Sequence, residues 1–335
     1  MDQALSRTTS TLAPPPAPTP GWGLGLDGGG TATRWALAAP GGSIAAEGQV
    51  AGISGLQLAD AAGRDSMART MAALAADVQR LAPGRAAASM VAGLTGFASD
   101  DGADGTEGAA LQALLAAPFG LPVACVQAMS DIELACRAAF APGQGAVLYA
   151  GTGSIAAFLA ADGTLHRAGG RGAVIDDAGG GHWIAREALR LIWRAEDAAP
   201  GAGAHSVNRA ESALGRQVFA AVGGSAWADT RAWVYGASRG ELGTLALAVA
   251  AAAREGNAPA LALLQQAGQE LARLANCLHQ RFGPLPLALA GRVFELHPAI
   301  EASLLAALPA GTIIHRLAMP AHHQAAVLAA ARGSS

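Results

Sequence analysis

The stretch GLGLDGGGTATRWALAA, residues 23–39, contains the pattern that decides the fold. Two apolar runs flank a glycine-rich turn, and this arrangement predicts a buried strand, a turn and a second strand paired with the first. A tight hairpin turn needs at most two glycines, whereas Gly28, Gly29 and Gly30 follow one another here. Consecutive glycines let backbone N–H groups approach a phosphate without obstruction by Cβ atoms. We interpret the turn as a phosphate loop, with an ordinary glycine-rich hairpin as the alternative.

Polar side chains beside this turn suit the same chemistry. Thr31 and Thr33 carry hydroxyl groups that can donate to phosphate oxygens, and Asp27 ends the first apolar run. A carboxylate repels a phosphate, but it can hold Mg²⁺ through water because this ion keeps several of its waters. We therefore expect Asp27 to lie near a magnesium ion.

A second glycine-rich turn, Gly151-Thr152-Gly153-Ser154, lies between two apolar runs later in the chain. One such turn is a weak signal. Two of them, in successive halves of the chain, predict a pair of phosphate loops that face each other across a cleft. Because helical patterns follow each strand–turn–strand unit, the sequence favours a duplicated α/β architecture.

An acid at the start of a predicted helix is the candidate catalytic base. Ser130 and Glu133 have the spacing of a capping box, which predicts that a helix begins here. Asp131 then lies in the first helical turn, where the macrodipole favours an ionised carboxylate. It could there accept the proton of a bound hydroxyl during phosphoryl transfer. A plain capping acid is the alternative, but the position just before the second turn favours the base.

A glycine-rich loop over residues 168–183 carries two adjacent carboxylates, Asp176 and Asp177, before a predicted helix. They could bind vicinal hydroxyl groups of a sugar. A solvated turn with a helix cap is one alternative, and a metal site completed by His182 is a weaker one.

Composition excludes several other functions. The chain has 335 residues, a length that predicts two domains. It is 52% hydrophobic and 14% charged, and its net charge of −3 gives no sign of the basic surface that binds nucleic acid or an anionic membrane. It contains no lysine, which excludes a Walker-type phosphate loop. Its longest apolar stretch, near Leu245–Ala253, is shorter than the ~20 residues of a membrane span. Three widely spaced cysteines and no apolar leader segment fit a cytoplasmic protein.

Hydrophobic periodicity predicts the remaining elements. The expected further strands are 43–50, 87–93, 122–128, 285–289 and 312–316. The expected helices are 59–82, 107–116, 183–194, 240–254, 258–282 and 320–332.

Taken in order, these motifs resemble those of N-acetylglucosamine kinases and their BadF-type ATPase relatives. The order is DGGGT, SD at a helix start, GTGS, a GGxG…DD loop and LALAGRVF at residues 287–294. The resemblance implies an α/β, two-lobed actin-like ATPase (ribonuclease H-like) fold, with duplicated mixed-sheet domains around a central cleft that holds ATP and Mg²⁺. We expect a disordered tail over 1–20, a first domain over 21–128 completed by a helix over 318–333, and a second domain over 129–317.

The resemblance also assigns roles to individual residues. The first phosphate loop would comprise Gly28, Gly29, Gly30, Thr31, Thr33 and Arg34, with Asp27 near the metal. The second would comprise Gly151, Thr152, Gly153 and Ser154. Asp131 would be the base, Ala290 and Gly291 would lie against the adenosine, and the sugar would contact Thr152, Gly172, Asp177 and Ser54.

Departures from the family pattern cluster on the sugar side. Arg171 stands where the family has tryptophan in GGWG, residues 176–180 read DDAGG in place of GDEGS, and the loop 51–57 lacks the usual asparagine. A missing amide can remove discrimination of 10⁴-fold or more, as an order of magnitude. The sequence thus supports a kinase better than it supports N-acetylglucosamine, glucosamine, a muramic-type derivative or another sugar.

The expected function is phosphorylation of an amino-sugar hydroxyl by ATP, in a chain that binds no nucleic acid or membrane. The resemblance also allows a homodimer, which the sequence itself does not indicate. One alternative is an ATP-hydrolysing activator that works through an iron–sulfur cluster, which requires paired cysteines. Another is a non-catalytic sensor of nucleotide or sugar, although a pure binder needs no positioned base.

Overall fold

The structure is a computed structural model that describes residues 21–30, 32–97, 105–198, 211–317 and 319–332. The predicted tail over 1–20 and the candidate Thr31 lie outside the described residues. The chain divides into two compact units. The N-terminal unit comprises the described residues up to Asp131 and those from Pro320 onward, and the C-terminal unit is Ile132–Met319.

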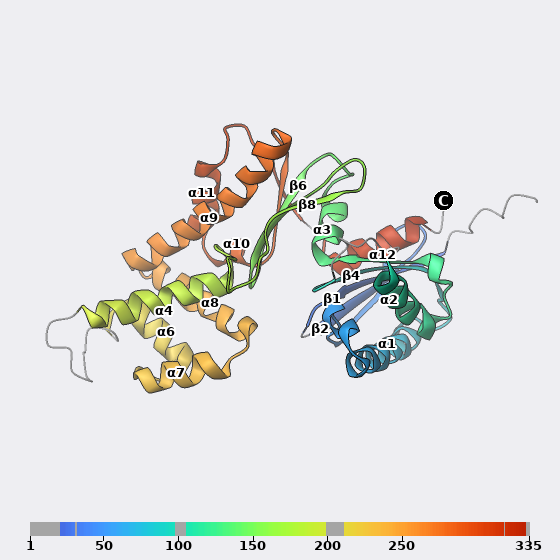
Figure 1. The fold of residues 1–335 in the computed structure, drawn as a ribbon, viewed down its shortest axis with the longest axis horizontal. Coiled ribbons are helices and arrows are strands. Elements are labelled where there is room, and N and C mark those ends of the chain that lie inside the picture. The colour runs from blue at the N-terminus through green and yellow to red at the C-terminus, as the bar shows by residue number, and fades with distance from the viewer. Residues whose placement is uncertain (1–20, 31, 98–104, 199–210, 318, 333–335) are drawn as a thin grey trace, which may run out of the picture. The chain divides into compact units, whose positions relative to one another are not determined.

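Each unit is built on one five-stranded mixed sheet (Figure 1). The strand order is β3-β2-β1-β4-β5 in the N-terminal unit and β10-β9-β6-β7-β8 in the C-terminal unit. The N-terminal strands are β1 (Trp22–Gly28), β2 (Ala32–Ala38), β3 (Ile44–Ala51), β4 (Ala87–Leu94) and β5 (Val126–Ser130). The C-terminal strands are β6 (Ala146–Ala150), β7 (Ser154–Leu159), β8 (Leu165–Gly169), β9 (Leu287–Ala290) and β10 (Ile314–Arg316).

Helices cover both sheets. The N-terminal unit has α1 (Ala61–Leu81), α2 (Thr106–Ala116), α12 (Ala321–Arg332) and the 3-10 helices η1 (Gly55–Ala59), η3 (Ala117–Phe119) and η4 (Val123–Cys125). The other helices are α3 (Asp131–Ala139), α4 (Gly181–Asp197), α6 (Ala213–Val222), α7 (Trp227–Gly236), α8 (Arg239–Arg254), α9 (Ala258–Phe282), α10 (Val293–Leu296) and α11 (Pro298–Ala307). None of the described helices is long and apolar enough to cross a membrane.

Leucine and glycine alternate along β1, and this alternation explains how the strand packs on both of its faces. Leu24 and Leu26 are fully buried in the core that also contains the apolar face of α1. Successive side chains of a strand point to opposite faces, and on the other face Gly23 and Gly25 lie against α12. A Cβ atom at Gly25 would overlap the backbone nitrogen of Ala326. The glycines therefore allow the C-terminal helix to pack directly on the strand (Figure 1).

The predicted strand–turn–strand units and the α9 helix over 258–282 are confirmed. The predicted strand 122–128 is partly wrong, because its first half is the 3-10 helix η4. Pro122 begins this turn, and the amide of Cys125 donates to the carbonyl of Pro122 at 2.9 Å. Strand β8 and helices α6 and α7 were not predicted.

The core of the C-terminal unit is rich in alanine and leucine from α4, α8 and α9.

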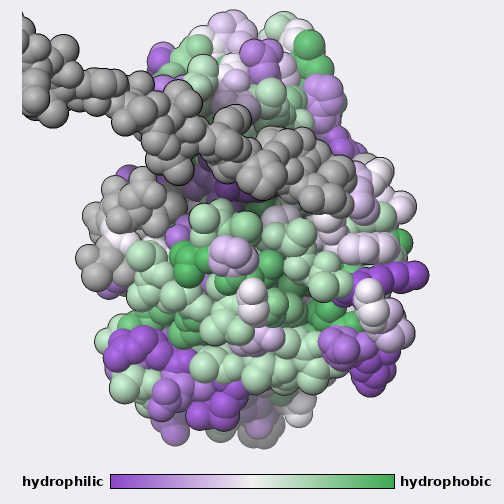
Figure 2. Space-filling view, turned by 90° about the vertical axis from the view of Figure 1, so that its right-hand side faces the viewer, coloured by the Kyte–Doolittle hydropathy of each residue, from purple (hydrophilic) through white to green (hydrophobic). Residues whose placement is uncertain are grey.

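Small apolar residues are also common at the surface of the chain, and pale green covers much of the face drawn in Figure 2. This distribution follows from a composition that is 52% hydrophobic and 14% charged.

Candidate functional site

The N-terminal unit brings Asp27 and Asp131 to the same edge of its sheet. Strands β1, β4 and β5 are parallel, and Gly28, Leu94 and Ser130 are in register across them. Asp27 precedes Gly28 and Asp131 follows Ser130, so both acids lie at the carboxyl ends of strands, with β4 between them. Ligands of open α/β sheets bind at this edge.

The two acids interact electrostatically. The pKa of Asp27 is raised above its ordinary value, first by burial and then by the negative charge of Asp131, while the guanidinium of Arg34 acts in the opposite direction. Arg34 is exposed and pairs in register with Asp27 on the neighbouring strand. Asp131 is itself exposed at the start of α3. A cation bound beside these carboxylates would offset their repulsion.

The first turn is held against the loop that carries Ser54. The hydroxyl oxygen of Thr33 is buried and accepts a hydrogen bond from the amide of Ile53 at 3.0 Å. A Cβ atom at Gly52 would overlap the carbonyl oxygen of Gly30. Thr33 therefore anchors the loop in this structure, and the half-buried Ser54 lies next to that anchor.

The start of α4 holds the second turn in the C-terminal unit. The amide of Gly181 donates to the carbonyl of Gly151 at 2.8 Å, and the amide of His182 donates to that of Thr152 at 3.0 Å. The buried hydroxyl of Ser154 donates to the carbonyl of Ala178 at 2.7 Å. These bonds fix the backbone of the turn, while the side chain of Thr152 is exposed.

An ion pair that the sequence analysis missed lies against this turn. Arg239, at the start of α8, donates to the carboxylate of Asp177, whose side chain is only 3% exposed. Among the described residues other than glycine, Asp177 alone has a positive φ, 60°. A Cβ atom at Gly153 would lie 2.5 Å from Nη2 of Arg239 and 2.7 Å from Oδ2 of Asp177. The pair is thus in immediate contact with the glycine turn.

The two residues expected near adenosine lie beside the second turn. Strands β6 and β9 are parallel, with Tyr149 opposite Ala290. Gly291 has φ +96°, and a Cβ atom there would overlap the carbonyl oxygen of Ala150. Close approach and left-handed backbone both require glycine at this position.

Gly172 lies in the loop before α4, where Val174 and Ile175 are 99% and 77% exposed. Asp176 forms an ion pair with Arg273 at 3.1 Å. Among the described residues, Asp176, Asp177 and His182 do not form a metal-ligand cluster, so the structure does not bring together the metal site weighed as an alternative.

The sequence pattern of the BadF/BadG/BcrA/BcrD ATPase family matches residues 24–307, which is most of the chain and includes both glycine turns and both acids. The chain belongs to this family. No curated protein matches it at a significant level.

Solved structures share its two-lobed actin-like fold. A proposed N-acetylglucosamine kinase from Chromobacterium violaceum has 26% identity and a TM-score of 0.67, over 92% of this chain and 98% of that one. A protein of the same proposed activity from Porphyromonas gingivalis has 16% identity and a TM-score of 0.60, with the same coverage. A ROK family glucokinase from Streptomyces griseus, solved with glucose and AMPPNP, has 17% identity and a TM-score of 0.55, over 94% and 99%. The last two likenesses show the fold alone.

Proposed function

We propose that this family member is an ATP-dependent kinase that phosphorylates a hydroxyl group of an amino sugar of the N-acetylglucosamine or glucosamine type. The observation that carries the proposal is the electrostatic coupling of Asp27 and Asp131 at the carboxyl edge of one sheet. Phosphoryl transfer needs a metal-holding acid and a base within one site. A plain capping acid at position 131 would not need a second, half-buried carboxylate beside it.

The donor set fits a magnesium ion. Carboxylate oxygens are the protein ligands that Mg²⁺ prefers, and it binds through one or two of them while keeping several waters. Burial and the charge of Asp131 raise the pKa of Asp27. A cation bound nearby would act in the opposite direction and favour the ionised form of that acid. When bound, the ion neutralises charge on the transferring phosphate.

Groups of the chain itself are proposed to bind the nucleotide and to accept the proton. Backbone amides of the first and second turns are proposed to bind the phosphates of the same ATP, with Ala290 and Gly291 against the adenosine. Asp131 accepts the hydroxyl proton as the sugar oxygen bonds to the γ-phosphorus and the bond to ADP breaks.

Asp177 is the proposed contact for the sugar hydroxyls, together with the exposed side chain of Thr152, Gly172 of the loop and Ser54 of the N-terminal unit. Arg239 holds the carboxylate of Asp177 in its buried position, which leaves its second oxygen as an acceptor for a substrate hydroxyl. The solved structure at 26% identity, a proposed N-acetylglucosamine kinase, supports an amino sugar as the substrate class.

The iron–sulfur activator hypothesis fits the cysteines poorly. Cys136 is buried, and burial together with the neighbouring Glu133 raises the pKa of its thiol to about 12. Iron–sulfur clusters are held by several cysteine thiolates, and among the described residues no group of potential metal ligands contains a cysteine.

Release of ADP across a panel of N-acetylglucosamine, glucosamine, N-acetylmuramic acid and glucose tests the proposal. The kinase predicts ADP release that depends on one of the amino sugars. An activator or a simple ATPase would release ADP at the same rate without any sugar, and that result would exclude the proposal.

A further inference from the structure

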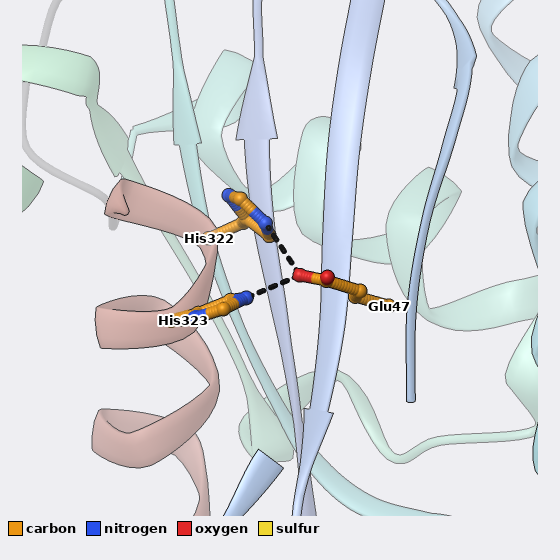
Figure 3. A group of neighbouring side chains, drawn as sticks. All are labelled: Glu47, His322 and His323. Carbon is orange, nitrogen blue, oxygen red and sulfur yellow. Dashed lines mark hydrogen bonds and ion pairs between the residues drawn. The ribbon is translucent and has the colours of Figure 1, made fainter. Parts of the chain in front are cut away.

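Three potential metal ligands converge within the N-terminal unit. Glu47 lies on the edge strand β3, while His322 and His323 lie in the first turn of α12, far along the chain (Figure 3). Nε2 of His322 is 3.5 Å from Oε2 of Glu47, and Nε2 of His323 is hydrogen-bonded to the same oxygen. One donor atom from each residue lies within 4.8 Å of the others.

The packing of α12 on the sheet creates this convergence. At Gly25, a Cβ atom would overlap the carbonyl oxygen of His322, so the start of the helix lies directly on β1. Ala36 of β2 is fully buried and pairs in register with Glu47 of β3. Because Gly25 and Ala36 are small residues beneath the start of the helix, the histidine rings reach across β2 to the edge strand.

The burial of the cluster is graded from His322 outward to Glu47. The side chain of His322 is 9% exposed, that of His323 is 20% exposed and that of Glu47 is 58% exposed. Nδ1 of His322 is buried without a hydrogen-bond partner among the described atoms, so this ring makes its polar contact through Nε2. His322 therefore forms the inner side of the cluster, and its outer side at Glu47 is open to water.

The three side chains also influence one another's charge. Hydrogen bonds from His323 and His322 lower the pKa of Glu47. Burial, the neighbouring His323 and the charge of Arg34 lower the pKa of His322, although Glu47 acts in the opposite direction.

We propose that Glu47, His322 and His323 bind one divalent transition-metal ion of the zinc type, with a remaining coordination position for water. Two imidazoles and a carboxylate form a ligand set that suits zinc, whereas magnesium and calcium prefer oxygen ligands. The site is therefore chemically distinct from the one proposed at Asp27. Its occupant would link the edge strand β3 to the C-terminal helix α12.

Zinc binding by the full chain, purified without a histidine tag, tests this site. Equilibrium dialysis against Zn²⁺ followed by elemental analysis should find one zinc ion per chain. Glu47→Gln and His323→Ala should each weaken binding by at least about tenfold. Matched controls are Glu301→Gln, which alters a half-buried acid paired with Arg316, and His315→Ala, and both should bind like the unaltered chain.

Thermal unfolding supplies a second measurement. Zinc that binds only the folded chain should raise the melting temperature in proportion to the logarithm of its concentration. This rise should disappear in the Glu47 and His323 variants and persist in both controls. Absence of zinc binding at micromolar concentration, or binding that survives in Glu47→Gln and His323→Ala, would overturn the proposal.

Discussion

The carboxylates of Asp27 and Asp131 interact from opposite sides of β4, and the charge of Asp131 raises the pKa of Asp27. Burial is the larger cause of this shift. Two acids that destabilise each other's ionised forms lower the stability of the folded chain. Such arrangements concentrate at functional sites. This relationship leads to the first two predictions.

In an Asp131→Asn variant, the pKa of Asp27 should fall, because the nearby negative charge is removed. It should stay above the ordinary value of 3.8, since burial remains. A carboxyl-carbon NMR titration of Asp27, without nucleotide or metal, measures both effects. A pKa of Asp27 that does not change in the variant would show that the two acids do not interact.

Replacement of Asp27 by asparagine should stabilise the protein without ligands at pH 8 while abolishing kinase activity. The raised pKa means that the folded chain binds this proton more tightly than the unfolded chain, so stability is lost as pH rises through the folded pKa. Asparagine avoids that loss. The melting temperature of Asp27→Asn should therefore exceed that of the unaltered chain at pH 8, and the difference should vanish below pH ~3.8. Equal melting temperatures at pH 8 would contradict the argument.

Loss of the Arg239 side chain should affect both stability and the sugar. Asp177 is 3% exposed, and a buried group left unpaired costs about 1–3 kcal/mol. Denaturant unfolding of Arg239→Ala should show this loss, with a raised KM for the sugar. As a control, Arg216→Ala removes the exposed pair with Glu255 and should cost only about 0–1 kcal/mol. Similar losses in both variants would refute a special role for Arg239.

Gly291→Ala should destabilise the C-terminal unit and weaken ATP binding. The added Cβ atom would overlap the carbonyl of Ala150, in a backbone conformation with φ +96°. A strained conformation of this kind costs about 1–3 kcal/mol before any steric clash is counted. Gly256→Ala is the matched control, because its φ is +82° and no atom lies within 4 Å of the added Cβ. Calorimetric titration with ATP should separate the two variants, and equal affinities would contradict the placement of Gly291.

Local patterns predicted much of the fold. The apolar runs on either side of each glycine turn formed paired strands, and α9 has the predicted bounds over 258–282 because its apolar face repeats at helical spacing. Local patterns missed β8, whose residues are all half-buried and lack a strong alternation. They also missed α6 and α7, which precede α8, although Ser212 caps the start of α6 and Gly223 ends it.

The position of a site residue could be predicted only where the order of the strands along the chain determines it. Asp27 and Asp131 end or follow strands that turned out to be parallel, so their shared edge follows from topology. Arg239 was not predictable, because its partner Asp177 lies 62 residues earlier and the two meet only through tertiary packing. The capping box of Ser238 and Glu241 marks the start of α8, but a helix start alone does not identify the acid that its first arginine will bind.

The most direct test of the account is phosphorus NMR of the unaltered chain and the Asp131→Asn variant, each incubated with ATP, Mg²⁺ and the amino sugar that supports ADP release. The account predicts a sugar-phosphate signal from the unaltered chain, a rate at least about 10²-fold lower in the variant, and retained ATP binding. The exposed-acid control Asp65→Asn should behave like the unaltered chain. Sugar-phosphate formation at an unchanged rate in Asp131→Asn would contradict the account.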